Sequence, residues 1–242
     1  MENTKERVIG ILVAIIVAVC AIVLAGCSGG ASSNSQPEQQ KSNEPSPLEI
    51  VDSGYTIQPL PDGKCKILYG VMVENPNDGW FANDVWIDVT ARNADGNVAD
   101  TDLQGTACIF CDGKVAICGA TTIEKAESLE FSIDEMRVNW EEGTLTQEEV
   151  DSVLYTKGLT ESRDAYGTFK LSGEIVNDTD NALSIPTVNV LMRDSSDKII
   201  GGFRGYVDNV APQKTTAFTV HEYDVPKYAS LEAYIDLGNV TN

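Results

Sequence analysis

A repeat of about 100 residues constrains the fold of this 242-residue chain more than any other feature. Three blocks of similar sequence recur in the same order: residues 71–78 with 173–180, 87–98 with 188–199, and 128–130 with 230–232. The offset is 101 or 102 residues in every block. Blocks that stay in register over such a distance predict two copies of one domain, at residues 48–140 and 144–242.

Within each copy, apolar and polar residues alternate in short segments. Ile67, Tyr69, Val71 and Val73 would share one face of a strand, and residues 85–92 follow the same pattern. Clusters of Asn, Asp, Gly and Pro separate these segments, as is typical of turns. The predicted fold class is therefore all-β, with two tandem Ig-like antiparallel β-sandwich domains after an N-terminal signal helix and a disordered linker.

The sequence at the join between the copies predicts at most one helical turn followed by a strand. Thr146-Gln147-Glu148-Glu149 has the spacing of a capping box, in which the Thr and Glu side chains each accept a hydrogen bond from the other residue's backbone N–H. Residues 153–159 could then form the first strand of the second copy.

The first 26 residues predict an export signal. Lys5 and Arg7 precede an uninterrupted run of apolar or small residues, at positions 8–26. The run ends in Leu24-Ala25-Gly26-Cys27, which resembles the lipobox of bacterial lipoproteins. This resemblance implies cleavage before Cys27 and a lipid on that cysteine. The alternative is an uncleaved signal anchor, because a helix of this length would span roughly 28 Å, close to the hydrocarbon thickness of a bilayer.

Residues 27–47 predict a flexible linker after the lipidated cysteine. Positions 28–47 contain no aliphatic residue larger than Ala31, so burial could not offset the entropy cost of folding. We therefore expect a tether that holds the folded part away from the outer surface of the cell membrane.

The charge of the chain narrows the choice of partners. Its 17 Lys and Arg residues face 37 Asp and Glu residues, a net charge of −20. Such a balance repels phosphate backbones and anionic headgroups, which excludes nucleic acid as a partner. It leaves two interpretations: solubility in an exposed compartment, or attraction of basic partners or divalent cations.

One copy also carries a family resemblance. Residues 169–177 read Phe-Lys-Leu-Ser-Gly-Glu-Ile-Val-Asn, and residues 188–194 read Val-Asn-Val-Leu-Met-Arg-Asp. The pattern resembles the FxLYD-type domain, a small β-sandwich of bacterial lipoproteins and other exported proteins. Asp197 replaces the glycine of the family's Asp-x-x-Gly turn, whereas the first copy keeps Asp95-Gly96. The resemblance implies a structural module and carries no catalytic residue.

Four cysteines follow the proposed anchor, all in the first copy: Cys65, Cys108, Cys111 and Cys118. An even number in an exported chain predicts two disulfides. Three pairings are open, and we favour a bridge from Cys65 to Cys118 with a local bridge from Cys108 to Cys111. A four-cysteine zinc site, a thioredoxin-like redox pair and free thiols are the alternatives.

Other candidate sites are weaker. The only histidine, His221, has no nucleophile motif around it, so we expect a surface position on a strand. Acidic turns such as Asn75-Pro76-Asn77-Asp78 could bind calcium, although Asn and Asp are also ordinary turn formers. Trp80, Phe81 and Trp86 are candidates for an exposed aromatic partner surface, and the alternative is packing against the second sandwich.

These features together predict a lipid-anchored extracytoplasmic protein that binds or scaffolds. Its partners would be the membrane, through the lipid on Cys27, and an extracytoplasmic protein or a cell-envelope component. A structural stalk without a ligand is one alternative. A thiol- or metal-dependent enzyme at Cys108 and Cys111 is the other. We expect no catalytic residue, no cofactor and no bound metal.

Overall fold

The computed structural model describes residues 44–237, so Cys27, the signal segment and most of the predicted linker lie outside the described residues. The first half contains β1 (Glu49–Pro59), β2 (Lys64–Asn75), β3 (Trp80–Arg92), β4 (Val98–Ile109), β5 (Gly113–Glu124), β6 (Ser128–Ile133) and β7 (Asn139–Glu142). Helix α2 (Gln147–Asp151) leads to the second half, with β8 (Leu154–Arg163), β9 (Phe169–Asn177), β10 (Thr187–Arg193), β11 (Ile199–Tyr206), β12 (Lys214–Glu222) and β13 (Ser230–Asp236).

Both halves have the same sheet topology. In the first half, one sheet has the order β1-β2-β5 and the other β4-β3-β6, with β7 also paired to β3. In the second half, the sheets β8-β9-β12 and β11-β10-β13 repeat these orders. All strand pairs in these sheets are antiparallel. The predicted all-β sandwich fold is confirmed.

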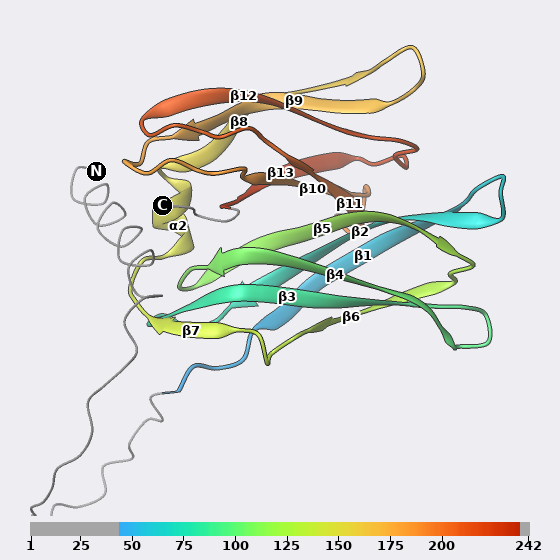
Figure 1. Cartoon of the computed structure of the whole chain (residues 1–242), viewed down its shortest axis with the longest axis horizontal. Coiled ribbons are helices and arrows are strands. Elements are labelled where there is room, and N and C mark those ends of the chain that lie inside the picture. Colours follow the sequence, from blue (N-terminus) through green and yellow to red (C-terminus); the bar gives the residue numbers. More distant parts are fainter. Residues whose placement is uncertain (1–43, 238–242) are drawn as a thin grey trace, which may run out of the picture.

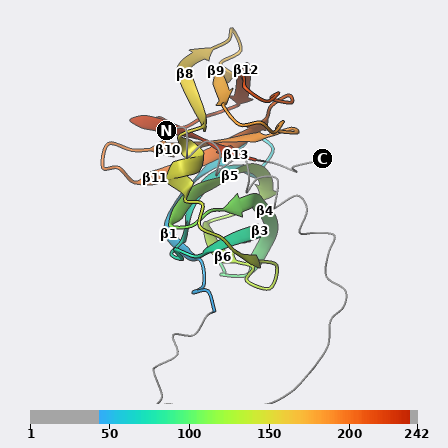
Figure 2. The ribbon, with the colours of Figure 1, turned by 90° about the vertical axis from the view of Figure 1, so that its left-hand side faces the viewer.

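The four sheets lie in a stack (Figure 1). The two inner sheets, β1-β2-β5 and β11-β10-β13, pack against each other, and Figure 2 shows the same stack from the side. Strand β2 is therefore buried on both faces. One apolar cluster contains Leu68 and Phe81 from the first half together with Phe169 and Phe203 from the second. Because the halves share this cluster, the division into two domains stays a prediction.

The predicted helical turn is confirmed. The Thr146 side chain accepts a hydrogen bond from the Glu149 backbone N–H at 3.3 Å, and the Glu149 carboxylate accepts one from the Thr146 N–H at 3.0 Å. This capping box starts α2, and Val150 anchors the helix in the core. Strand β8 begins three residues after the helix ends, as the sequence predicts.

The repeat reproduces a buried asparagine at the end of β2 and of β9. The Asn75 side-chain amide donates to the carbonyl oxygens of Trp80, Ile109 and Phe110, at 2.7 to 3.2 Å. Asn177 lies 102 residues later and donates to three carbonyls at equivalent places, those of Asn181, Val210 and Ala211. Both asparagines are fully buried. Each one ties its strand to two loops at one end of its half.

Four glycines allow the inner sheets to approach closely. Gly54 of β1 and Gly70 of β2 are direct partners in the ladder. A Cβ atom on Gly54 would lie 1.8 Å from the Ile199 carbonyl oxygen, and one on Gly70 would lie 2.3 Å from Leu191 Cδ1. From the other side, a Cβ on Gly202 would lie 2.7 Å from Cys118 Sγ, and one on Gly201 would lie 3.0 Å from the Leu68 carbonyl oxygen. We call these residues, Gly54, Gly70, Gly201 and Gly202, the glycine seam.

Polar contacts reinforce the glycine seam. Lys66, which is 9% exposed, forms an ion pair with Glu222 at 2.6 Å and donates to the Tyr223 carbonyl oxygen. Arg193 Nη1 lies 2.9 Å from the Asp52 carboxylate. Both contacts join the first half to the second: Arg193 with Asp52 links the two inner sheets, and Lys66 with Glu222 links β2 to β12.

Candidate functional site

The four cysteines of the described residues are free thiols, so the predicted disulfides are absent from the structure. The bridge from Cys65 to Cys118 is wrong for a geometric reason. Cys65 pairs with Ile123 and Cys118 with Gly70, which separates them by five ladder positions, roughly 17 Å. A disulfide needs Cα atoms within about 7 Å of each other.

The two cysteines also face opposite sides of their sheet. Cys65 follows the same alternation as Ile67 and Tyr69, which point into the core of the first half. Cys118 packs with Leu191 and Ile199 of the second half. A four-cysteine metal site is therefore excluded by the same geometry, and the described residues hold no group of three or more His, Cys, Asp or Glu side chains that could bind a metal ion.

The local pair, Cys108 and Cys111, is also unbridged. Burial raises the pKa of the Cys108 thiol well above its ordinary value, and burial likewise raises the pKa of Cys111. The Cys111 thiol lies 3.3 Å from the Gly143 carbonyl oxygen, to which it donates. Thiols that stay protonated at neutral pH are poor nucleophiles, which argues against a thiolate active site here.

Alkylation of the native and the denatured protein tests this thiol state. We expect iodoacetamide to modify half-buried Cys65 first, and to reach Cys108 and Cys118 only after unfolding, because both are buried. Peptide mass spectrometry without any reductant should then find all four positions alkylated. A peptide pair that stays cross-linked in denaturant would contradict the structure and restore the disulfide prediction.

The three aromatic candidates for a partner surface differ in their burial. Phe81 is buried and packs edge-on against Phe110 at 5.4 Å between ring centroids, so its prediction as an exposed contact is wrong. The reason is that β3 is buried on both faces here: Phe81 joins the apolar cluster shared by the two halves, whereas Val85 faces the core of the first half, and Asp84 between them has a φ of 54°. Trp80 and Trp86 are half-buried. The indole of Trp86 lies beneath the Arg137 guanidinium, 5.6 Å from the ring centroid.

The weaker candidates take structural roles. His221 is exposed on β12, as predicted. The Asn77 amide donates to Asn75 Oδ1 at 2.8 Å and to the Ser46 carbonyl oxygen at 2.9 Å, so this turn uses its side chains to organise the backbone. The calcium interpretation of the turn stays an untested prediction.

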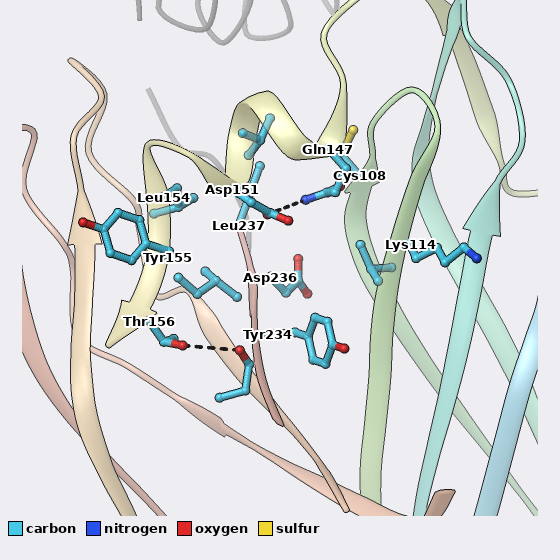
Figure 3. A pocket seen from close by; sticks show the side chains of 14 residues that line it. Cys108, Lys114, Gln147, Asp151, Leu154, Tyr155, Thr156, Tyr234, Asp236 and Leu237 are labelled. Atoms are coloured by element: carbon cyan, nitrogen blue, oxygen red, sulfur yellow. Dashed lines mark hydrogen bonds between the residues drawn. The ribbon is translucent and has the colours of Figure 1, made fainter. Parts of the chain in front are cut away.

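A cavity of about 240 Å³ lies where the two halves meet beside α2 (Figure 3). Cys108 and Lys114 line it from the first half, and Asp151 lines it from α2. Tyr155 and Tyr234 line it from β8 and β13. Figure 3 shows these side chains arriving from separate elements. Apart from Cys108, no residue of this lining is a candidate in the sequence, because the lining comes from segments that only the tertiary fold brings together.

The lining of this cavity combines apolar walls with polar groups. Leu154, Val115 and Ile235 supply apolar surface. Burial raises the pKa of the Asp151 carboxyl, which also accepts a hydrogen bond from Gln147 Nε2 at 3.0 Å. Such a lining suits a small ligand with an apolar body and hydrogen-bonding groups.

Comparison with known proteins identifies no family for this chain. No family model matches the chain, and no curated protein sequence matches it. Among solved structures, red sea bream transglutaminase is similar with a TM-score of 0.23 and 9% identity, over 78% of this chain and 30% of that chain. Amycolatopsis orientalis exo-chitosanase CsxA is similar with a TM-score of 0.18 and 11% identity, over 69% and 23%. The chain spans less than a third of either structure, and likenesses this remote carry no argument about function.

The structure gives one observation that bears on membrane association. Within residues 44–237, no helix is long and apolar enough to cross a membrane.

Proposed function

We propose that this protein is a lipid-anchored extracytoplasmic binding or scaffolding protein, held to the outer surface of a bacterial membrane through Cys27. The lipobox-like Leu24-Ala25-Gly26-Cys27 supports the anchor. The observation that carries the binding role is the joint between the halves. The glycine seam and the ion pair of Lys66 with Glu222 hold two sandwiches in one register, and a cavity opens along that joint.

The structure of this joint favours a binding role over a role as a structural stalk. A spacer needs only length, which sandwiches joined by an ordinary linker would supply. In this protein the backbones of the two halves approach each other closely, and residues of both halves line a cavity. Rigid surroundings keep the shape of a binding site without a ligand, which lowers the entropy cost of binding.

Fractionation of a Cys27→Ala variant tests the anchor. We expect the wild-type chain in the membrane fraction, with an acylated N-terminal peptide that begins at Cys27, and we expect the variant to lose this peptide. Cys20→Ala is the matched control, because Cys20 lies inside the apolar run and outside the lipobox. A wild-type N-terminal peptide that still begins at Met1 would show an uncleaved signal anchor instead.

A cavity-filling variant tests the binding role. Ala233 lines the cavity, and Ala233→Phe would occupy part of its 240 Å³. We expect small amphipathic fragments to raise the Tm of the wild type by a few degrees and to have no effect on the variant, since a ligand stabilises only the state that binds it. Ala94→Phe, in an exposed turn, is the control. Equal shifts for Ala233→Phe and the wild type would eliminate this cavity as the site.

A further inference from the structure

A second hollow lies along the joint, and it is lined by large apolar side chains from both halves. It has a volume of about 400 Å³ and contains Trp86 of β3, Ile185 and Tyr206. A neighbouring hollow of about 520 Å³ shares Ile185 and Tyr206. Ile185 is 57% exposed and Tyr206 is 68% exposed. Three segments thus present apolar surface to solvent at one concave place, which is uncommon without a partner.

The loop that carries Ile185 is held in a costly conformation. Ile185 has a φ of 52°, in the left-handed region, which a β-branched residue rarely adopts. The Asn209 side chain accepts a hydrogen bond from the Ile185 N–H at 3.1 Å, and the Val207 N–H donates to the Pro186 carbonyl oxygen at 2.9 Å. These bonds fix the loop so that an apolar side chain projects into solvent. Strain of this kind is concentrated at functional sites.

The two aromatic rings of the hollow are positioned by arginines. The Arg137 guanidinium lies 5.6 Å from the Trp86 ring centroid, and the Arg204 guanidinium lies 5.7 Å from that of Tyr206. On the sheet side, a Cβ atom on Gly105 would come within 2.9 Å of the Trp86 ring. Because these ring faces are already covered, a partner would contact the edges and the uncovered surface of the two rings. The hollow does not offer two open ring faces on which a partner could stack.

The rim of the hollow is acidic. Asp84 and Asp208 lie around the two hollows, and both are exposed. Arg137 is neutralised by its ion pair with Asp134 at 2.9 Å, which leaves Arg204 as the basic group beside these two acids. The chain as a whole has a net charge of −20. The field therefore attracts a basic partner and repels a second copy of this chain.

The backbone beside the hollow favours a polypeptide partner. Strand β4 is at the edge of its sheet, and so is β11. The Ala107 N–H of β4 points away from β3, because it donates to the Asp236 carboxylate at 3.0 Å. In an antiparallel ladder the backbone groups two residues away point the same way, so those of Gly105 are directed toward the hollow. An extended segment could bond to them.

We propose that this hollow, bounded by Trp86, Ile185 and Tyr206, is the docking surface for a basic segment of a partner protein. The segment inserts an apolar side chain among the three residues, and its Lys or Arg side chains meet the aspartates of the rim. This proposal deepens the binding role proposed above and rests on it, but it does not depend on the anchor at Cys27.

A peptide selection on the immobilised full-length chain tests the proposal. A random-peptide display library is selected on the wild type alone, and the enriched peptides are then measured on Ile185→Gly. Glycine adopts a positive φ readily, so this variant keeps the loop and loses only the apolar side chain. Tyr206→Ser is the second variant, and Tyr166→Ser, at a tyrosine 93% exposed in another turn, is the matched control.

We expect the selected peptides to carry Lys or Arg around an apolar residue. Their Kd should rise about 10-fold or more in Ile185→Gly and Tyr206→Ser, remain unchanged in Tyr166→Ser, and rise with salt for the wild type. The proposal is overturned by a library without enrichment, by enriched peptides that lack basic residues, or by equal binding to Ile185→Gly. Displacement of the peptides by neutral oligosaccharides would assign the hollow to a glycan instead. Because no membrane is present, loss of the anchor in cells would leave these results unchanged.

Discussion

Replacing Gly54 by alanine is expected to lower the free energy of unfolding by about 3 kcal/mol or more. The new Cβ would lie 1.8 Å from the Ile199 carbonyl oxygen, a backbone atom that cannot rotate away. The two inner sheets would have to separate, which removes packing from the buried Met72 and Leu191 as well. Urea unfolding followed by far-UV circular dichroism measures the loss.

Gly79→Ala is the matched control for this experiment. A Cβ at Gly79 meets nothing within 4 Å, and the residue has no positive φ. We expect this variant to stay within about 0.5 kcal/mol of the wild type. If Gly54→Ala behaved like Gly79→Ala, the close packing of the inner sheets would be refuted, and with it the rigid joint on which the proposed binding role depends.

The sequence predicted the parts of the fold that depend on local pattern. Alternation and turn residues predicted the strands, the 101- to 102-residue offset predicted a repeated strand order, and the capping box predicted α2. Each of these signals lies within one short segment or recurs in register. The buried asparagines Asn75 and Asn177 fall in the first matched block, so the repeat extends to hydrogen bonds as well.

The wrong predictions concern residues at the joint between the two halves. Residues 67–73 form a continuous apolar run, which is typical of a strand buried on both faces, yet only the odd positions were assigned to a core. The predicted bridge placed Cys118, on the neighbouring strand β5, in the same core as Cys65. A strand covered on both sides has no solvent face, so alternation alone could not tell which core Cys118 joins.

The glycine seam also had a signal that sequence reasoning did not use. Single glycines inside strands indicate close approach of another backbone, and Gly54 and Gly70 are such residues. What the sequence could not supply was the identity of the approaching strand. The packing of β1 and β2 against β11 depends on long-range contacts, and so do both hollows along the joint.

Alanine at Asn75 or at Asn177 is expected to cost about 3 kcal/mol of unfolding free energy in either half. Each substitution removes five hydrogen bonds, three donated and two accepted by the asparagine side chain, and leaves carbonyl groups without their donor at a fully buried position. Equal costs would show that the repeat preserves an energetic role and not only a sequence pattern. Asn97→Ala, exposed in a turn, is the control and should change stability by less than about 0.5 kcal/mol.

The Asn177→Ala variant also tests whether the halves unfold together. All three tryptophans, Trp80, Trp86 and Trp140, lie in the first half, so tryptophan fluorescence reports that half alone. The substitution is in the second half. Because one apolar cluster and the glycine seam join the halves, the fluorescence midpoint in urea should fall together with the circular dichroism midpoint. A fluorescence transition that does not move would mean two independently folding domains, and the joint would then be a contact between modules rather than a rigid site.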